Sequence, residues 1–247
     1  MDIKEEDILG ETVSKHWYYR SKAKALIYFL EGFKPQNILD IGAGSGFFSK
    51  QLLNQSNTTQ ATCVDISYTS DSKQTFNNKP IFYQRQCDSG NADLVLMMDV
   101  LEHVDDDLAL LSEYISKVPN QTKFMITVPA FSFLWSEHDL FLKHKRRYTL
   151  KQVEQLLKNA GLEIKRSAYY FSLVFPIALL SRLPGILVQK ITHQANAGQA
   201  KSLLKQHSFL TNAFLSMLCQ LELPLMKRNR IAGLSVFCLA QKTQTTR

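Results

Sequence analysis

Three glycines and a set of aspartates near the start of the chain have the types and spacing to hold a nucleoside. The sequence GAGSG (42–46) follows an apolar run, and glycines there let the backbone approach a ligand closely. Asp65 ends a second apolar run, where a carboxylate can accept both hydroxyls of a ribose. Asp88 follows a third run and could accept from an adenine amino group, while Asp40 could steady an ammonium beside the glycines. The pattern therefore indicates a nucleoside-binding loop.

The spacing of the glycines separates this loop from two other well-known loops. A dinucleotide-binding loop follows G-x-G-x-x-G, and here Phe47 stands at the position of the last glycine. A P-loop requires Gly-Lys-Ser/Thr, which the sequence lacks. The alternative is a glycine-rich turn kept only for packing, and each aspartate alone is more typical of a turn or cap. The ordered set of four elements favours the ligand site.

A second group of reactive side chains lies in LWSEHDLFLKHKRRYT (134–149). We interpret His138 as a general base that Asp139 orients. Arginines can hold a phosphate or carboxylate by bidentate hydrogen bonds. The candidate residues for binding a second reactant, the acceptor, are Trp135, Arg146, Arg147 and Tyr148. The alternative is that the two arginines form a solvated turn and that Tyr148 packs against the next helix.

His103, in DVLEHV (99–104), is a further candidate base. A structural role competes with this interpretation, because Glu102 and His103 open a helix, where polar capping residues are common. No metal site is predicted. The four cysteines form no C-x-x-C pair and indicate neither zinc nor a disulfide framework.

Short apolar runs alternate with helical segments along the chain, which predicts a doubly wound α/β fold with a mainly parallel sheet. The predicted strands are residues 37–41, 61–66, 81–85, 93–98, 123–128, 162–170 and 234–242. The predicted helices are residues 16–33, 47–55, 105–118 and 149–159. We divide the chain into an N-terminal helical lid (1–35), a nucleoside-binding domain (36–170 and 232–242) and a helical insertion (171–231).

The charge of the chain is uneven. The formal net charge is +7, yet residues 140–247 hold 17 Lys and Arg against 3 acidic residues. The insertion is both basic and strongly apolar, and its apolar residues recur at helical spacing after Phe209. It is interpreted either as a lid over the active site or as an element that contacts an anionic membrane surface. Both interpretations predict a long, apolar acceptor.

Four segments resemble motifs of the class I S-adenosylmethionine-dependent methyltransferases, in the branch that acts on small molecules and lipid precursors. They are LDIGAGSG (39–46), VDIS (64–67), QCDSG (86–90) and DLVLMMDVLEHVDDD (93–107). The resemblance implies a Rossmann-like seven-stranded sheet with its last strand antiparallel, and the insertion between strands six and seven. It implies S-adenosyl-L-methionine as cofactor and S-adenosyl-L-homocysteine as product. The implied cofactor residues are Asp40, Gly42, Ala43, Gly44, Gly46, Asp65, Ile66, Asp88 and Met98.

The same resemblance extends to the N-terminal segment HWYYRSK (16–22), which is similar to a lid helix of this branch. Trp17 and Tyr18 could cover the cofactor, and Arg20 or Lys22 could meet its carboxylate; core packing of the aromatics is the alternative. One departure is the short stretch between strands three and four, where the usual helix has no room.

The expected reaction is methyl transfer to a hydrophobic or lipid-linked acceptor, such as a quinone-like ring, a polyprenyl-linked sugar or an aryl-lipid. The expected location is the cytoplasm, with peripheral contact to the cytoplasmic face of a membrane. Two alternatives stay open: a nucleic-acid methyltransferase, and a methyltransferase-like protein that binds without catalysis. Nucleic acid is disfavoured because the basic residues are interleaved with leucine and phenylalanine. The sequence predicts no oligomeric state.

Overall fold

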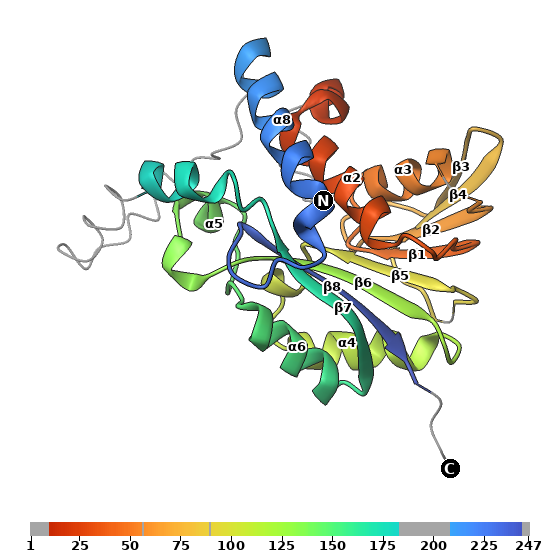
Figure 1. Ribbon diagram of the computed structural model, residues 1–247. Coiled ribbons are helices and arrows are strands. Elements are labelled where there is room, and N and C mark those ends of the chain that lie inside the picture. The colour runs from red at the N-terminus through yellow and green to blue at the C-terminus, as the bar shows by residue number, and fades with distance from the viewer. Residues whose placement is uncertain (1–9, 56, 89, 183–207, 244–247) are drawn as a thin grey trace.

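The computed structural model describes residues 10–55, 57–88, 90–182 and 208–243. In these residues one eight-stranded sheet has the order β3-β4-β2-β1-β5-β6-β8-β7, with helices on both faces (Figure 1). The strands are β1 (Asn37–Ile41), β2 (Gln60–Val64), β3 (Ser72–Phe76), β4 (Lys79–Gln84), β5 (Leu94–Met98), β6 (Lys123–Pro129), β7 (Leu162–Tyr170) and β8 (Ser235–Lys242). Strands β4, β2, β1, β5 and β6 run parallel, and β8 pairs antiparallel with both β6 and β7. The predicted doubly wound fold is confirmed.

The sheet has one strand more than predicted. Strand β3 pairs antiparallel with β4 and forms a hairpin at the edge of the sheet. Its sequence, SKQTF, is polar and almost wholly exposed, so it lacks the apolar signal that marks the other strands. The described residues between β4 and β5 contain no helix, as the short stretch there led us to expect.

Two hydrophobic cores lie on opposite faces of the sheet. Helices α2 (Trp17–Phe29), α3 (Phe47–Gln55) and α8 (Phe209–Met226) cover one face. Helices α4 (Asp107–Lys117) and α6 (Leu150–Asn159) cover the other (Figure 1). The shorter helical segments are η1 (Gly10–Lys15), η2 (Leu101–His103), η3 (Ser132–Leu134) and α5 (Glu137–Phe141).

Capping residues fix where the helices begin near the site. The Asp106 carboxylate accepts a hydrogen bond from the backbone N–H of Ala109 at the start of α4. Thr149 and Gln152 form a reciprocal capping box at the start of α6. These caps end the loops that follow β5 and β6, which are the loops that carry the candidate catalytic residues.

The segment between β7 and β8 contains a helix over residues 175–182 and helix α8; residues 183–207 of the predicted insertion lie outside the described residues. Helix α8 packs against α2 (Figure 1), and the buried Glu222 carboxylate accepts hydrogen bonds from the backbone N–H groups of Ser172 and Leu173. The carboxylate therefore ties α8 to the end of β7.

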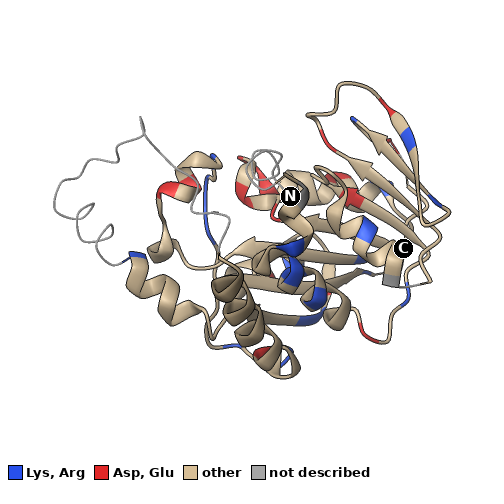
Figure 2. Cartoon of the chain, turned by 90° about the horizontal axis from the view of Figure 1, so that it is seen from above, with Lys and Arg blue, Asp and Glu red and all other residues tan. Residues whose placement is uncertain are grey.

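One helix in the described part of the chain, α8, is long and apolar enough to cross a membrane, and 28% of it is buried in the protein. Core helices of soluble proteins also meet this criterion, so the finding is weak evidence for a span. The large exposed apolar side chains of α8 are Phe209, Leu210, Phe214, Met217, Leu221 and Leu225. In Figure 2 segments with basic residues and segments with acidic residues both occur across the view.

Candidate active site

The glycine loop turns sharply between β1 and α3. The backbone N–H groups of Gly42 and Ala43 both donate to the carbonyl of Val64, at 2.8 and 3.2 Å, which joins the loop to the end of β2. Gly42, Gly44 and Gly46 have φ angles of +63°, +54° and +71°, a conformation that residues with a side chain rarely adopt.

Two of these glycines also lack room for a side chain. A Cβ atom on Gly42 would lie 2.8 Å from Cγ2 of Val100, and one on Gly46 would lie 3.0 Å from Sγ of Cys63. The loop therefore presents bare backbone at the carboxyl ends of β1 and β2. Ligands bind at this edge in open α/β sheets.

Asp65 lies against this loop. Its Oδ2 atom accepts a hydrogen bond of 3.0 Å from the backbone N–H of Gly44, and its Oδ1 atom accepts from the backbone N–H of Ser67. The hydroxyl of Tyr68 donates to the Gly44 carbonyl. The structure thus brings Asp65 and the glycines together, as the sequence analysis predicted.

A cavity of about 350 Å³ opens beside the loop. Its lining residues are Ile41, Gly42, Val64, Asp65, Ile66, Ser67, Asp99, Val100, His103, Val104, Leu110 and Tyr114. The volume is within the range of small-molecule sites. The mostly apolar walls with one carboxylate near the loop suit an adenosyl group.

Of the nine predicted cofactor residues, Gly42, Asp65 and Ile66 line this cavity, and six do not: Asp40, Ala43, Gly44, Gly46, Asp88 and Met98. Asp88 is exposed in the described part of the loop between β4 and β5. Met98 is buried at the end of β5. Asp40 is buried behind the loop, and its Oδ2 atom accepts a hydrogen bond of 2.7 Å from the Ser49 hydroxyl. Burial raises the pKa of Asp40 to about 6. A role of Asp40, Asp88 and Met98 in cofactor binding stays a prediction.

Asp99, which follows β5, lines the cavity instead and is held by helix α2. The ammonium of Lys22 forms an ion pair with its Oδ2 atom and a hydrogen bond of 3.2 Å to the hydroxyl of Tyr18. Burial alone would lower the pKa of Lys22, but the charges of Asp99 and Tyr18 hold it above its ordinary value. The φ of Asp99 is +59°, which is unusual for a residue with a side chain. Strained positions of this kind cluster at functional sites.

A second cavity, of about 340 Å³, adjoins the first. Asp99 and His103 line both cavities. The apolar part of the second wall contains Trp17, Pro129, Leu142, Val174, Ile177, Ala178, Leu215 and Leu234. Its polar part contains His16, Tyr18, Glu102, His138, His144, Arg147, Ser181, Arg182 and Ser235. The chain thus builds an apolar chamber with a polar, histidine-rich end that meets the nucleoside-type cavity.

The Asp139 carboxylate holds a histidine that the sequence analysis did not predict. His138 lines the second cavity, and the ring of His144 hydrogen-bonds to the Asp139 carboxylate, at 2.9 Å between Nδ1 and Oδ1. Arg147 donates to both oxygens of the same carboxylate, at 2.7 and 3.0 Å. Burial alone would raise the pKa of Asp139, but His144 and Arg147 hold it well below its ordinary range. Asp139 is therefore a charged anchor for His144 and Arg147.

Of the four predicted acceptor-binding residues, one lines the second cavity and three line neither cavity. Arg147 lines the second cavity, although its guanidinium already binds Asp139 and the carbonyl of Ala130. Arg146 donates to Asp107 and to the carbonyls of Val104 and Asp105, and it lines neither cavity.

Like Arg146, Tyr148 and Trp135 line neither cavity. Tyr148 is buried, and its hydroxyl contacts the Leu101 carbonyl and the Asp107 carboxylate. The alternative interpretation, that Tyr148 packs, matches this position. Trp135 is only partly buried at the end of η3 and lines neither cavity.

The sequence analysis missed Asp99, Glu102, His144 and Arg182 as site residues. The first three stand in segments that the analysis had singled out, DVLEHV and LWSEHDLFLKHKRRYT, so a signal was present. Arg182 stands in the insertion, and its guanidinium donates to the Leu134 carbonyl at 2.9 Å. Burial and the charge of Arg147 lower the pKa of Arg182 to about 10. Only the folded chain shows that these residues meet.

Comparison with protein families matches residues 14–167, more than half of the chain, to a family described as a methyltransferase domain. The matched segment contains the glycine loop, Asp65 and both loops that carry the histidines. Comparison with curated proteins gives no significant match.

Solved structures with the same fold come from several systems. One is the complex of the Haloferax volcanii Trm112 methyltransferase activator with a protein assigned as a methyltransferase, at 12% identity, TM-score 0.56, and coverage of 98% of this chain and 95% of that one. Another is Haemonchus contortus phosphoethanolamine N-methyltransferase 2 with phosphomonomethylethanolamine and S-adenosylhomocysteine, at 18% identity and TM-score 0.56. That alignment covers 98% of this chain and 57% of the Haemonchus chain.

A third similar structure is the [4+2]-cyclase SpnF, at 12% identity, TM-score 0.52, and coverage of 92% of this chain and 83% of that one. At these identities the similarity establishes the fold alone. One of these three proteins is named as a cyclase. The fold alone therefore does not identify the reaction, which depends on the residues of the site.

Proposed function

We propose, from the premise that this chain belongs to the methyltransferase-domain family, that it transfers a methyl group from S-adenosylmethionine to an apolar small molecule. The main support for this proposal is that Gly42 has no side chain. A Cβ atom at Gly42 would contact Val100 and fill the space beside the loop. Gly42 and Asp65 would lie against the nucleoside, because both line the first cavity. The cofactor supplies an electrophilic methyl group on a positively charged sulfur.

The chain's own residues would align the two reactants and exclude water. Asp99 lies where the two cavities meet and has a pKa below its ordinary value, because the charge of Lys22 outweighs the opposite effect of burial. A carboxylate at this junction favours a cationic sulfur. Helix α2 contributes Trp17 and Tyr18 to the wall of the acceptor chamber, which shields the junction from solvent.

The acceptor that fits the second cavity is apolar over most of its length. Trp17, Val174, Ile177 and Leu215 form a wall from three separate segments. The polar residues Glu102, His103 and His144 lie close together in the same lining. This division suits a ring or head group with an attached hydrocarbon chain, such as a quinone-like ring, a polyprenyl-linked sugar or an aryl-lipid. The exposed apolar side chains of α8 support delivery of this acceptor from a membrane surface.

Two measurements on the full chain test the proposal. Calorimetry with S-adenosylhomocysteine should give tight binding that the Gly44→Arg variant loses, since Gly44 has a positive φ beside Asp65. Incubation with radiolabelled S-adenosylmethionine and cell extracts should place the label in the organic-solvent fraction. Label found in RNA would identify a nucleic-acid methyltransferase, and binding without any transfer would identify a non-catalytic protein.

A further inference from the structure

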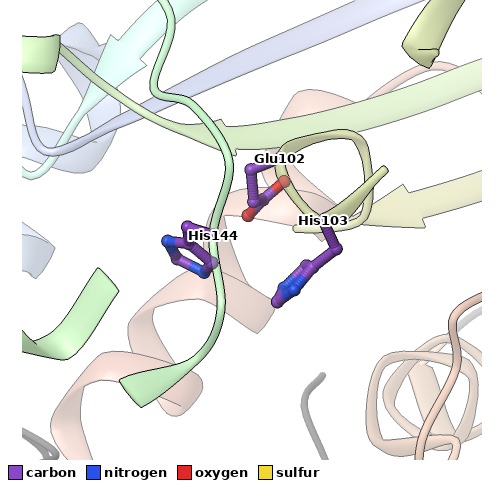
Figure 3. Close-up of side chains that lie close together, drawn as sticks. All are labelled: Glu102, His103 and His144. Carbon is purple, nitrogen blue, oxygen red and sulfur yellow. The ribbon is translucent and has the colours of Figure 1, made fainter. Parts of the chain in front are cut away.

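Three side chains that can bind a metal ion converge at the polar end of the acceptor chamber. Glu102, His103 and His144 each offer one ligand atom, and these atoms lie within 4.8 Å of one another. Glu102 and His103 come from the turn after β5, and His144 comes from the segment after α5 (Figure 3). Around a bound cation, ligand atoms at about 2.1 Å from the metal lie about 3.0–3.4 Å apart. Side-chain rotation closes the remaining separation.

Glu102 points to a missing cationic partner. Its side chain is fully buried, and neither carboxylate oxygen has a hydrogen-bond partner among the described residues. A buried carboxylate without partners is costly, and buried charges are normally paired or bound to a metal.

The protein cations around Glu102 already have other partners. Lys22 binds Asp99, and Arg147 binds Asp139 and the Ala130 carbonyl. Arg182 donates to the Leu134 carbonyl. None of these three cations donates a hydrogen bond to the Glu102 carboxylate.

His144 is oriented in the manner of a metal ligand. Its Nδ1 atom lies 2.9 Å from the Asp139 carboxylate, whose charge Arg147 stabilises. A carboxylate that accepts from Nδ1 fixes the tautomer with the lone pair on Nε2, and carboxylate–histidine–metal arrangements are common. The rings of His103 and His144 lie 4.7 Å apart between centroids at an angle of 84°, so both face the same space.

The two loops that carry these ligands are joined by further hydrogen bonds. The backbone N–H of Lys145 donates to the Glu102 carbonyl at 2.7 Å, next to both Glu102 and His144. Arg146 and Tyr148 donate to carbonyls of the same turn. These bonds fix the two loops relative to each other, and a metal site needs ligand groups that are held in place.

We propose that Glu102, His103 and His144 bind one divalent transition-metal ion, with Asp139 as the residue that positions His144. Two imidazoles and one carboxylate suit ions such as Zn²⁺, Mn²⁺, Fe²⁺ or Co²⁺ and leave coordination positions open. The sequence analysis predicted no metal site, because the cysteine pattern reports only on sulfur ligands. The proposed site has nitrogen and oxygen ligands.

The position of the site also narrows the acceptor class, an extension that rests on the proposed methyl transfer. His103 lines both cavities, so the ion lies where the acceptor meets the methyl group. A hydroxyl or phenol oxygen that takes an open position has a lowered pKa and loses its proton to His138, the general base in the lining of the same chamber. Its lone pair forms the new O–C bond while the electron pair of the C–S bond passes to sulfur. The acceptor atom is therefore an oxygen.

Metal binding is testable without turnover. The full chain, freed of metal by chelation, is titrated with Zn²⁺, Mn²⁺ and Mg²⁺ by calorimetry, and the absorption spectrum of the Co²⁺ form reports nitrogen ligation. We expect one equivalent of Zn²⁺, at least 100-fold weaker binding for Glu102→Gln and His144→Ala, and 10- to 100-fold weaker binding for Asp139→Asn. His138→Ala is the matched control, because His138 lines the same chamber outside the triad. Its Zn²⁺ affinity should equal that of the wild type.

Circular dichroism shows which variants fold, and only folded variants are compared. Equal Zn²⁺ affinity in wild type, Glu102→Gln and His144→Ala, or no stoichiometric binding in the wild type, would overturn the site. Measurement of S-adenosylhomocysteine binding on the same samples separates the two proposals. Cofactor binding without metal binding refutes only the metal site, and metal binding without cofactor binding refutes only the methyltransferase. Methyl transfer to nitrogen or carbon in the metal-loaded protein refutes the oxygen acceptor.

Discussion

Lys22 on α2 and Asp99 after β5 form an ion pair in which the lysine side chain is fully buried and the aspartate keeps 26% of its surface exposed. The exposed part of Asp99 faces both cavities. The pair therefore joins the N-terminal helix to the point where cofactor and acceptor would meet. Because Thr127 Oγ1 also donates to Asp99 at 3.0 Å, the carboxylate is fixed from two sides. Helix α2 is thus anchored at the site, which favours its role as part of the chamber wall.

Breaking this pair should destabilise the fold. Lys22→Met leaves Asp99 without its cation, and we expect the free energy of unfolding to fall by about 3 kcal/mol, at the low end of the range for buried pairs because Asp99 is partly exposed. The double variant Lys22→Met/Asp99→Asn should lose less than the sum of the two single variants. Urea denaturation of all four proteins measures this coupling. Additive losses would show that the two side chains contribute independently.

Gly42 should be required for cofactor binding beyond its effect on stability. Gly42→Ala places a Cβ atom 2.8 Å from Val100 at a φ of +63°, so S-adenosylhomocysteine affinity should fall at least tenfold. Gly161→Ala is the matched control, because Gly161 has a φ of +83° and no atom within 4 Å of the added Cβ. Gly161→Ala should lose about 1 kcal/mol of stability because of its positive φ, and Gly42→Ala should lose more because of the contact with Val100. Calorimetry should separate them, and equal affinities would place the nucleoside away from Gly42.

Much of the scaffold was predictable because local patterns determine it. The strand of residues 37–41 was predicted with the bounds that β1 has, since an apolar run ends at glycine. Helix α6 followed from Thr149 as its cap and Gly161 beyond its end. The glycine loop and Asp65 were also placed correctly relative to each other, because both stand at the carboxyl ends of adjacent parallel strands.

The polar end of the chamber was less predictable because long-range hydrogen bonds determine it. Asp139 was paired with its chain neighbour His138, and the folded loop brings His144 and Arg147 to the Asp139 carboxylate. Glu102 was assigned to helix capping, since a sequence does not show that a carboxylate is buried without partners. Arg146 and Tyr148 were assigned to the acceptor, and their groups instead tie one loop to the next.

His138 should affect turnover more than cofactor binding. Its side chain lines the acceptor chamber and is absent from the wall of the nucleoside-type cavity. We expect His138→Ala to lower kcat tenfold or more, as loss of a general base does, while S-adenosylhomocysteine affinity stays within twofold of the wild type. Single-turnover methyl transfer and calorimetry measure the two quantities. Unchanged kcat would remove His138 from the mechanism and leave proton removal to solvent.

Asp40 should make the stability of the fold depend on pH. Burial raises its pKa from 3.8 to about 6 in the folded chain. The folded state therefore binds a proton more tightly than the unfolded state, so stability is highest at low pH and falls as pH rises between about 4 and 6. Above that window the ionised carboxylate costs up to about 3 kcal/mol.

Asp40→Asn keeps an oxygen that can accept from Ser49 and removes the charge. Relative to the wild type, its free energy of unfolding should rise by up to about 3 kcal/mol between pH 4 and pH 7. Urea denaturation at both pH values, without cofactor, measures the difference. If the two proteins show parallel pH profiles, the pKa of Asp40 is the same in the folded and the unfolded chain, which contradicts this prediction.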